Sequence, residues 1–220
     1  MTTLIDIWKS MDPARRPDKG WPQGYMYPYS LLLERYHTQP VTICELGVAG
    51  GKSMEMWDRY FTHPDTKIYG IDMDLSQYPL EMRKVLTNRV TLIDGDSLNL
   101  DKVGLNETTF DFVLDDGNHG VDTQTAFFKF FCPRLKPGGL LMIEDIHSKE
   151  NLLELINLHP KNFYLDTRNV NRWAHCPTHQ QIKDDSVTMV YVNEDMPDMW
   201  PNYEKTRPGT FNVDSVFEDQ

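Results

Sequence analysis

The sequence predicts an α/β fold in which helices flank a mostly parallel β-sheet. From residue 41 onward, short apolar runs alternate with segments whose apolar residues recur at helical spacing. Several of the apolar runs end abruptly in acidic residues, as expected where buried parallel strands reach the edge of a sheet. Two further strand-like runs lie close together near the C-terminus, which indicates a closing antiparallel hairpin. Strands that alternate with helices imply a doubly wound sheet.

The elements follow one another in a regular order. A Pro-, Gly- and Tyr-rich prelude ends in an expected helix over 29–37. Apolar runs then predict strands over 41–47, 67–74, 90–96, 110–116 and 139–145. Helical spacing predicts the helices between them over 53–61, 80–86 and 123–135, the last ended by the breaker sequence KPGG. A helix over 151–158 and strands over 162–169 and 186–193 complete a seven-stranded sheet.

Length and composition favour one globular domain over residues 1–220. We expect an N-terminal prelude over 1–40, a core over 41–193 and a C-terminal tail over 194–220. A formal net charge of -11 argues against nucleic acid as the main partner. No stretch has the length of a membrane span or the layout of a secretory signal, and three unpatterned cysteines favour a reducing cytoplasm. A homo-oligomer is compatible with the sequence.

The acidic ends of two neighbouring strands predict a metal centre. FDFVLDDGNHG brings Asp115, Asp116 and His119 to the end of one strand, and LLMIEDIH brings Glu144 and Asp145 to the end of the next. Ligands bind outside the carboxyl ends of strands in open α/β sheets. Carboxylates crowded together repel one another unless a cation lies among them, and oxygen ligands suit Mg²⁺.

A glycine-rich turn after the first strand predicts a cofactor site. ELGVAGGKS supplies Glu45, Gly47, Ala49 and Ser53, and glycines let the backbone approach a ligand closely. The glycines do not have the dinucleotide spacing G-x-G-x-x-G. An acid at the start of the turn would repel a pyrophosphate but attract the cationic amino-acid end of S-adenosylmethionine.

Three further strand ends carry acids suited to the rest of that molecule. The carboxylate of Asp72 can accept hydrogen bonds from both ribose hydroxyls, Asp96 is placed to meet the adenine amino group, and Asp115 faces the methionine portion. Each acid alone is equally well explained as a solvated turn residue. The ordered series of four acidic strand ends favours a cofactor site.

This series resembles the class I S-adenosylmethionine-dependent methyltransferases over residues 41–192, which implies a Rossmann-like fold. DDGNH followed by IED, with Asp18-Lys19-Gly20 and spaced tyrosines upstream, is similar to the metal-dependent sugar O-methyltransferases of macrolide and rhamnosyl-polyketide antibiotic pathways, the mycinamicin type. That resemblance implies that Mg²⁺ is bound by Asp116, Glu144 and Asp145 and that His119 is the general base. The tyrosine-rich prelude is expected to be a lid over the site, with a peripheral packing segment or a dimer contact as open alternatives. The chain departs from the family motif in having Asn118 where Ser is usual and in a glycine loop that is often longer in the family. We expect it to lack the extra N-terminal domain of some relatives.

The expected function is therefore Mg²⁺-dependent methylation of a hydroxyl on a sugar or glycosylated small molecule. A neutral histidine such as His119 can accept the hydroxyl proton at neutral pH. Three alternatives stay open: a catechol-type or other small-molecule O-methyltransferase, a relative of the cephalosporin hydroxylase-like proteins, and a binding module that retains cofactor contacts without turnover. A histidine after such a turn is often only a capping residue, and Glu144 and Asp145 could merely cap the following helix.

Overall fold

The computed structural model describes residues 2–20, 25–158, 163–166 and 187–193. Short 3₁₀ turns join several of the elements. The α-helices and strands in chain order are α1 (Leu4–Ser10), α2 (Met26–Leu33), β1 (Thr42–Leu46), α3 (Lys52–Tyr60), β2 (Lys67–Asp72), α4 (Leu80–Val85), β3 (Val90–Asp94), β4 (Phe110–Asp115), α5 (Val121–Phe131), β5 (Leu135–Ile146), α6 (Lys149–Leu158), β6 (Phe163–Asp166) and β7 (Val187–Val192).

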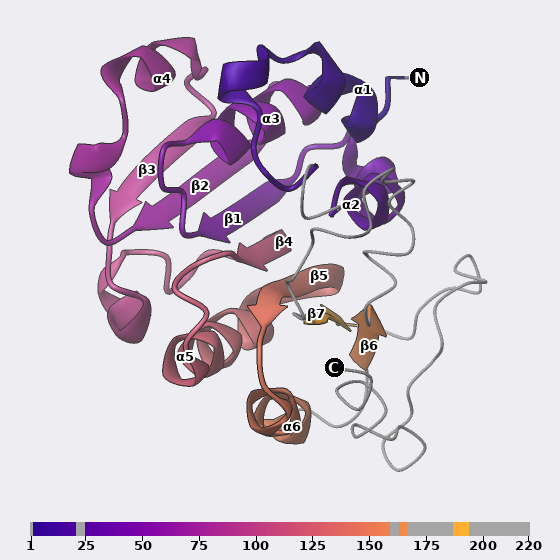
Figure 1. Cartoon of the computed structure of the whole chain (residues 1–220), viewed down its shortest axis with the longest axis vertical. Coiled ribbons are helices and arrows are strands. Elements are labelled where there is room, and N and C mark those ends of the chain that lie inside the picture. Colours follow the sequence, from indigo (N-terminus) through magenta and orange to yellow (C-terminus); the bar gives the residue numbers. More distant parts are fainter. Residues whose placement is uncertain (1, 21–24, 159–162, 167–186, 194–220) are drawn as a thin grey trace, which may run out of the picture.

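The strands form one sheet in the order β3-β2-β1-β4-β5-β7-β6 (Figure 1). Strands β1 to β5 pair in parallel, and β7 runs antiparallel to both of its neighbours, β5 and β6. This arrangement confirms the predicted α/β class, with a mostly parallel sheet and an antiparallel C-terminal pair. The strand order reverses at β1, because β2 and β3 lie on one side of it and β4 and β5 on the other. The loops after β1 and β4 therefore leave the same edge of the sheet side by side.

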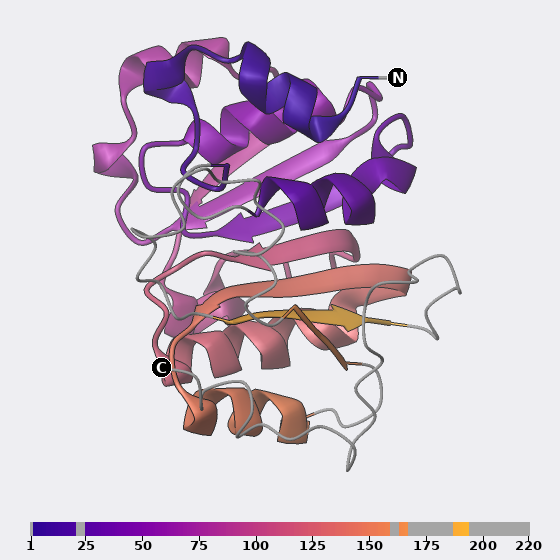
Figure 2. The same ribbon diagram turned by 45° about the vertical axis from the view of Figure 1, so that its right-hand side comes forward.

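The central strands are buried on both faces, and alternate side chains enter two different cores. Phe112 of β4 and Met142 of β5 pack in one core with α1, α2, α3 and α4. Val113 and Ile143, their neighbours in sequence, pack in the other core with α5 and α6. Figure 2 shows the two helical layers on opposite sides of the sheet, with the N-terminal helices on the α3 side.

The prelude contains a helix that the sequence analysis does not predict. Thr3 precedes α1, and its hydroxyl accepts a hydrogen bond from the backbone N–H of Asp6, while the Asp6 carboxylate accepts one from the backbone N–H of Thr3. This reciprocal capping box satisfies two otherwise unpaired donors at the helix start. Leu4 is fully buried, so the short helix is held by packing against the core as well as by its cap.

Several predicted boundaries differ from the structure. The helix expected over 29–37 is α2, which begins at Met26 and ends at Leu33, and two strand boundaries are also wrong. The KPGG sequence is predicted to separate a helix from a strand, but residues 136–139 lie inside β5, which begins at Leu135. Gly138 has a φ of 72°, and the pairing with β4 shifts register there, so glycine allows an irregularity within the strand instead of a break. Strand β3 ends at Asp94, before Asp96, which instead begins a 3₁₀ turn.

None of the described helices is long and apolar enough to span a bilayer. The expected tail over 194–220 lies outside the described residues. The single-domain organisation, the lid role of the prelude and the cytoplasmic location stay predictions.

Candidate active site at the carboxyl edge of the sheet

The predicted acids meet at the carboxyl edge because three parallel strands end in register. Leu46 of β1 pairs with Asp115 of β4, and Asp115 pairs with Ile143 of β5. Asp116 therefore follows directly beside the glycine loop, and Glu144 and Asp145 lie at the end of the neighbouring strand. The close placement that the sequence predicts for the two acidic strand ends is confirmed for these residues.

An irregularity in β5 turns Asp145 toward the same side as Glu144. Regular alternation would send the two side chains to opposite faces of the sheet. The pairing of β5 with β7 instead shifts register between Ile143 and Ile146. Asp145 has a φ of 54°, in the left-handed region that residues other than glycine rarely adopt. Strained backbone of this kind persists where surrounding structure fixes it, and it clusters at functional sites.

Asp116, His119 and Asp145 form a group that can hold a metal ion. Each offers one ligand atom, and these atoms all lie within 4.8 Å of one another. His119 Nε2 lies 3.7 Å from Asp145 Oδ2, and the side chain of His119 is 30% exposed. His119 also has a left-handed backbone, with a φ of 59°, and its buried Nδ1 atom has no hydrogen-bond partner. The ring is thus held toward the acids while one nitrogen stays available.

Lys19 also reaches this site, although the sequence pattern gives it no role there. Its side chain is 1% exposed although it belongs to the prelude. Its Nζ atom lies 2.5 Å from Asp116 Oδ2, 3.0 Å from Glu144 Oε2 and 3.3 Å from Glu45 Oε1. A buried ammonium is stable only when it is paired, and three carboxylates pair this one.

Two tyrosines of the prelude reach the same acids. The hydroxyl of Tyr25 donates to Asp145 Oδ1 at 2.5 Å, and the hydroxyl of Tyr29 donates to Glu144 Oε1. With Lys19 on its other oxygen, Glu144 is fully buried, and it does not belong to the group formed by Asp116, His119 and Asp145. These residues are visible in the sequence as the Asp-Lys-Gly motif and the spaced tyrosines. Their spacing alone, however, does not predict which acids they contact.

The charges at this site are unbalanced. Burial disfavours the ammonium form, but the neighbouring carboxylates of Asp116, Glu144 and Glu45 raise the pKa of Lys19 well above its ordinary value. One ammonium cannot neutralise all the carboxylates. The effect of burial therefore exceeds the effect of Lys19, and the pKa values of Glu45 and Glu144 are raised. An acidic site with only one internal cation fits an additional divalent ion, for which carboxylate oxygens are suitable ligands.

The glycine loop after β1 is built to approach a ligand and the next loop closely. Gly47 has a φ of 85°, and a Cβ atom there would lie 2.1 Å from the carbonyl oxygen of Asp116. Ala49 is also left-handed, with a φ of 41°. The carboxylate of Asp72 accepts hydrogen bonds from the backbone N–H groups of Val48 and Ala49 at 3.0 and 2.8 Å. Asp72 therefore fixes the loop, in addition to its predicted role toward a ribose.

The remaining predicted cofactor residues lie in different environments. Glu45 is buried and accepts a hydrogen bond from Trp57 Nε1 at 2.7 Å. Asp115 is 2% exposed, its Oδ1 accepts from Gly117 N, and its Oδ2 is buried without a partner. Burial raises the pKa of Asp115 to about 7. Asp96 is exposed, and its carboxylate accepts from the backbone N–H of Leu98, so its side chain caps a turn.

Two adjoining hollows lie over this edge, with volumes of about 610 Å³ and about 230 Å³. They share Gly47, Ala49 and Asp116. The larger hollow extends to Lys19 and Ser53, and the smaller one is also lined by Asp72, Met73, Gly95, Ser97, Gly117 and Asn118. Asp116 of the group with His119 and Asp145 therefore borders the same spaces as the predicted donor residues Gly47 and Asp72.

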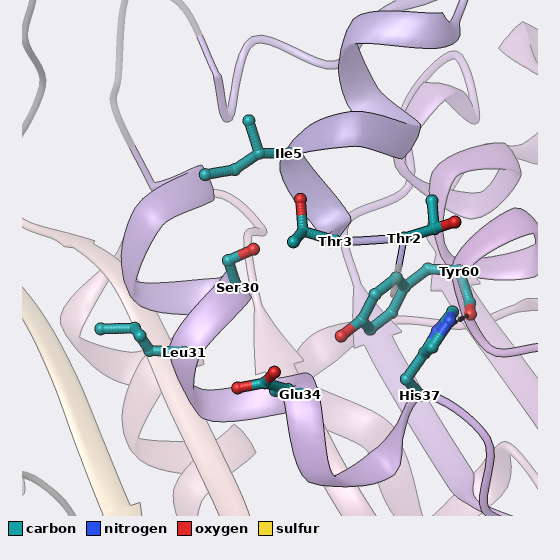
Figure 3. Close-up of a pocket in the computed structure, with 8 residues that line it drawn as sticks. All are labelled: Thr2, Thr3, Ile5, Ser30, Leu31, Glu34, His37 and Tyr60. Atoms are coloured by element: carbon teal, nitrogen blue, oxygen red, sulfur yellow. Dashed lines mark hydrogen bonds between the residues drawn. The ribbon is translucent and has the colours of Figure 1, made fainter.

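A separate hollow of about 200 Å³ lies near the amino end of β1 (Figure 3). His37, which precedes β1, stacks on Tyr60 at the end of α3, with ring centroids 4.6 Å apart. The Nδ1 atom of His37 is 2.6 Å from the carbonyl oxygen of Tyr60, so this nitrogen is occupied. Among the described residues, none of the buried polar atoms that lack a hydrogen-bond partner belongs to a residue lining this hollow.

The chain is similar in sequence to known methyltransferases. Residues 44–146 match a family model described as a methyltransferase domain. The mycinamicin VI 2''-O-methyltransferase of Micromonospora griseorubida is 32% identical over 141 residues, which are 59% of this chain and 33% of that protein. The 8-demethyl-8-alpha-L-rhamnosyl tetracenomycin-C 2'-O-methyltransferase of Streptomyces olivaceus is 33% identical over 140 residues, which are 60% of this chain and 35% of that protein. The chain thus spans about a third of the length of these relatives.

Solved structures agree on the fold. The mycinamycin-pathway methyltransferase MycE, in complex with Mg, SAH and mycinamycin VI, superposes with a TM-score of 0.62 at 22% identity, over 89% of this chain and 57% of that one. An rRNA methylase from Streptococcus thermophilus superposes with a TM-score of 0.56 at 17% identity, over 78% of this chain and 96% of that one. The resemblance to sugar O-methyltransferases that the motifs indicate is confirmed, while the fold alone does not select the acceptor.

Proposed function

From the methyltransferase domain matched over residues 44–146, we propose that this chain transfers a methyl group from S-adenosylmethionine to a hydroxyl of a sugar or glycosylated small molecule, with Mg²⁺ at the acidic site. The observation that carries the proposal is the group of Asp116, His119 and Asp145 beside the glycine loop. The relatives named for sugar O-methylation, and MycE, whose structure contains Mg and SAH, support it.

The donor would lie over the glycine loop. Asp72 already fixes that loop through one carboxylate oxygen, and it lines the smaller hollow, where it can accept from ribose hydroxyls. Asp115 has a buried oxygen without a partner that can accept from the ammonium group of the methionine portion. When bound, S-adenosylmethionine supplies an electrophilic methyl group. The protein orients it and excludes water from its path.

The acceptor would lie on the Asp116 side. Asp116 and Asp145, which form a group with His119, are proposed metal-binding carboxylates. The family motif adds Glu144 as the third expected ligand. A bound divalent ion lowers the pKa of a hydroxyl that it polarises. His119 holds the abstracted proton on its imidazole, and the Asp145 carboxylate, 3.7 Å from Nε2, stabilises the imidazolium that results.

Binding and turnover experiments test this proposal separately. We expect calorimetry to detect S-adenosylmethionine binding to the purified chain. Labelled donor should transfer its methyl group to members of a glycoside panel with vicinal hydroxyls, and EDTA should abolish that transfer. His119→Ala should lower turnover at least about a hundredfold while keeping donor affinity. Donor binding without transfer to any glycoside would contradict the proposed acceptor, and better transfer to catechols would replace it.

A further inference from the structure

Gln124 of α5 has a fully buried side chain that contacts the backbone of the acidic strand end. Its Nε2 atom lies 2.9 Å from the carbonyl oxygen of Glu144 and 3.5 Å from that of Asp145. Its Oε1 atom accepts a hydrogen bond from Nδ2 of Asn151, a residue of α6 that is 2% exposed. One side chain therefore ties α5 and α6 to the backbone of both acids.

The carbonyl groups of Glu144 and Asp145 lie where the strand pairing of β5 is interrupted. Strand β5 pairs with β4 as far as Ile143, and its pairing with β7 shifts register between Ile143 and Ile146. A buried carbonyl outside a regular ladder needs another donor, because an unpaired buried acceptor costs free energy. The Gln124 amide supplies that donor at the two residues whose carboxylates enter the site.

The Gln124 amide approaches the strand from the face of the sheet opposite to the site. Helix α5 packs in the core that contains Ile143, whereas Tyr25, whose hydroxyl donates to Asp145, packs in the core on the other face (Figure 2). Regular alternation would send the Asp145 side chain to the face that α5 covers. The backbone of Asp145, with a φ of 54° and with Gln124 at its carbonyl, directs the carboxylate to the Tyr25 side instead.

We infer that Gln124 is a positioning residue of the metal site, whose amide holds the backbone of Glu144 and Asp145 so that both carboxylates lie on one side. This inference rests on the metal site of the proposed function, in which both acids are ligands. Left-handed backbone at a residue other than glycine persists only where surrounding contacts fix it, and Gln124 provides such contacts. Removing a group that orients metal ligands without touching the ion lowers metal affinity by about ten- to a hundredfold.

Gln124→Met tests the inference, because it keeps the unbranched shape of the side chain and removes its amide. We expect Mn²⁺, titrated alone and followed by its electron paramagnetic resonance signal, to bind this variant at least about tenfold more weakly than the wild-type chain. The backbone ¹³C chemical shifts of Asp145, which report φ, should move away from left-handed values in the metal-free variant. Unchanged Mn²⁺ affinity or unchanged Asp145 shifts in folded Gln124→Met overturns the inference.

Thr125→Val is the matched control, since it removes a buried side-chain hydrogen bond from the same helix. The hydroxyl of Thr125 donates to Glu154 of α6, 3.3 Å away. The variant should be destabilised, but its Mn²⁺ affinity and its Asp145 chemical shifts should match those of the wild-type chain. A loss of Mn²⁺ affinity equal to that of Gln124→Met would mean that general loosening of α5 weakens the site, and the inference would be wrong.

Asn151→Ala is a second variant, and it decides the test if Gln124→Met does not fold. It leaves the Gln124 amide in place but removes the donor that fixes the direction of that amide. We expect a smaller loss of Mn²⁺ affinity than for Gln124→Met, and wild-type affinity would overturn the inference. A wild-type chain that binds no Mn²⁺ contradicts the metal site of the proposed function instead, and the Asp145 chemical shifts then decide whether Gln124 holds this backbone.

Discussion

Asp115→Asn should make the chain more stable at neutral pH and remove a specific pH dependence. Asp115 is 2% exposed, and one of its carboxylate oxygens has no partner. Burial raises the pKa of its carboxyl from 3.8 to about 7. In the folded chain this group therefore binds a proton more tightly than in the unfolded chain, so its contribution to stability is greatest at low pH and is lost as the pH rises toward 7.

The magnitude follows from that shift. A rise of about 3 pKa units corresponds to at most roughly 4 kcal/mol, at about 1.4 kcal/mol per unit. About 2 kcal/mol of this should be lost between pH 5 and pH 7, and little more above pH 8. Asparagine does not titrate. The difference in free energy of unfolding between Asp115→Asn and the wild-type chain should therefore change by about 2 kcal/mol in favour of the variant between pH 5 and pH 7.

Urea denaturation at pH 5, 6, 7 and 8, in EDTA, measures this difference. Asp101→Asn, at an exposed position, controls for the substitution itself. A difference between Asp115→Asn and the wild-type chain that stays constant within about 0.5 kcal/mol over this range would refute the reasoning. Saturating S-adenosylmethionine adds an independent check, because Asp115→Asn should weaken donor binding at pH 8, where the ionised carboxylate would pair with the ammonium group.

Three further substitutions test the site. Gly47→Ala should lower the free energy of unfolding, measured by urea denaturation, by roughly 2 kcal/mol or more. The reason is that Gly47 has a φ of 85° and an added Cβ would lie 2.1 Å from a backbone oxygen. Gly50→Ala is the control and should be nearly neutral, because a Cβ there meets nothing within 4 Å. Trp57→Phe should cost about 1–3 kcal/mol in the same assay, since it leaves the buried Glu45 without its indole donor, and a loss below about 0.5 kcal/mol would contradict that pairing. Asp72→Asn should weaken S-adenosylmethionine binding about tenfold in calorimetry, and unchanged affinity would exclude Asp72 from the donor site.

Local sequence patterns are enough to predict the sheet and the edge at which the site lies. Buried strands have apolar sequences, and in a parallel sheet their carboxyl ends meet at one edge, so the amino-acid order alone places Asp116 and Asp145 together. The glycine turn at Gly47 is equally predictable, because only glycine tolerates that close approach without cost.

Tertiary structure decides which partners the acids acquire. The bulge that turns Asp145 toward Glu144 depends on pairing with β7, a strand more than 40 residues later in the chain, and no local pattern encodes it. The ammonium of Lys19 reaches Asp116 across 97 residues of sequence. Local propensity describes a residue and its neighbours, whereas charge pairing in a buried site depends on distances that only the folded chain sets. Apolar periodicity therefore determines where the site lies, and long-range packing determines how its charges are balanced.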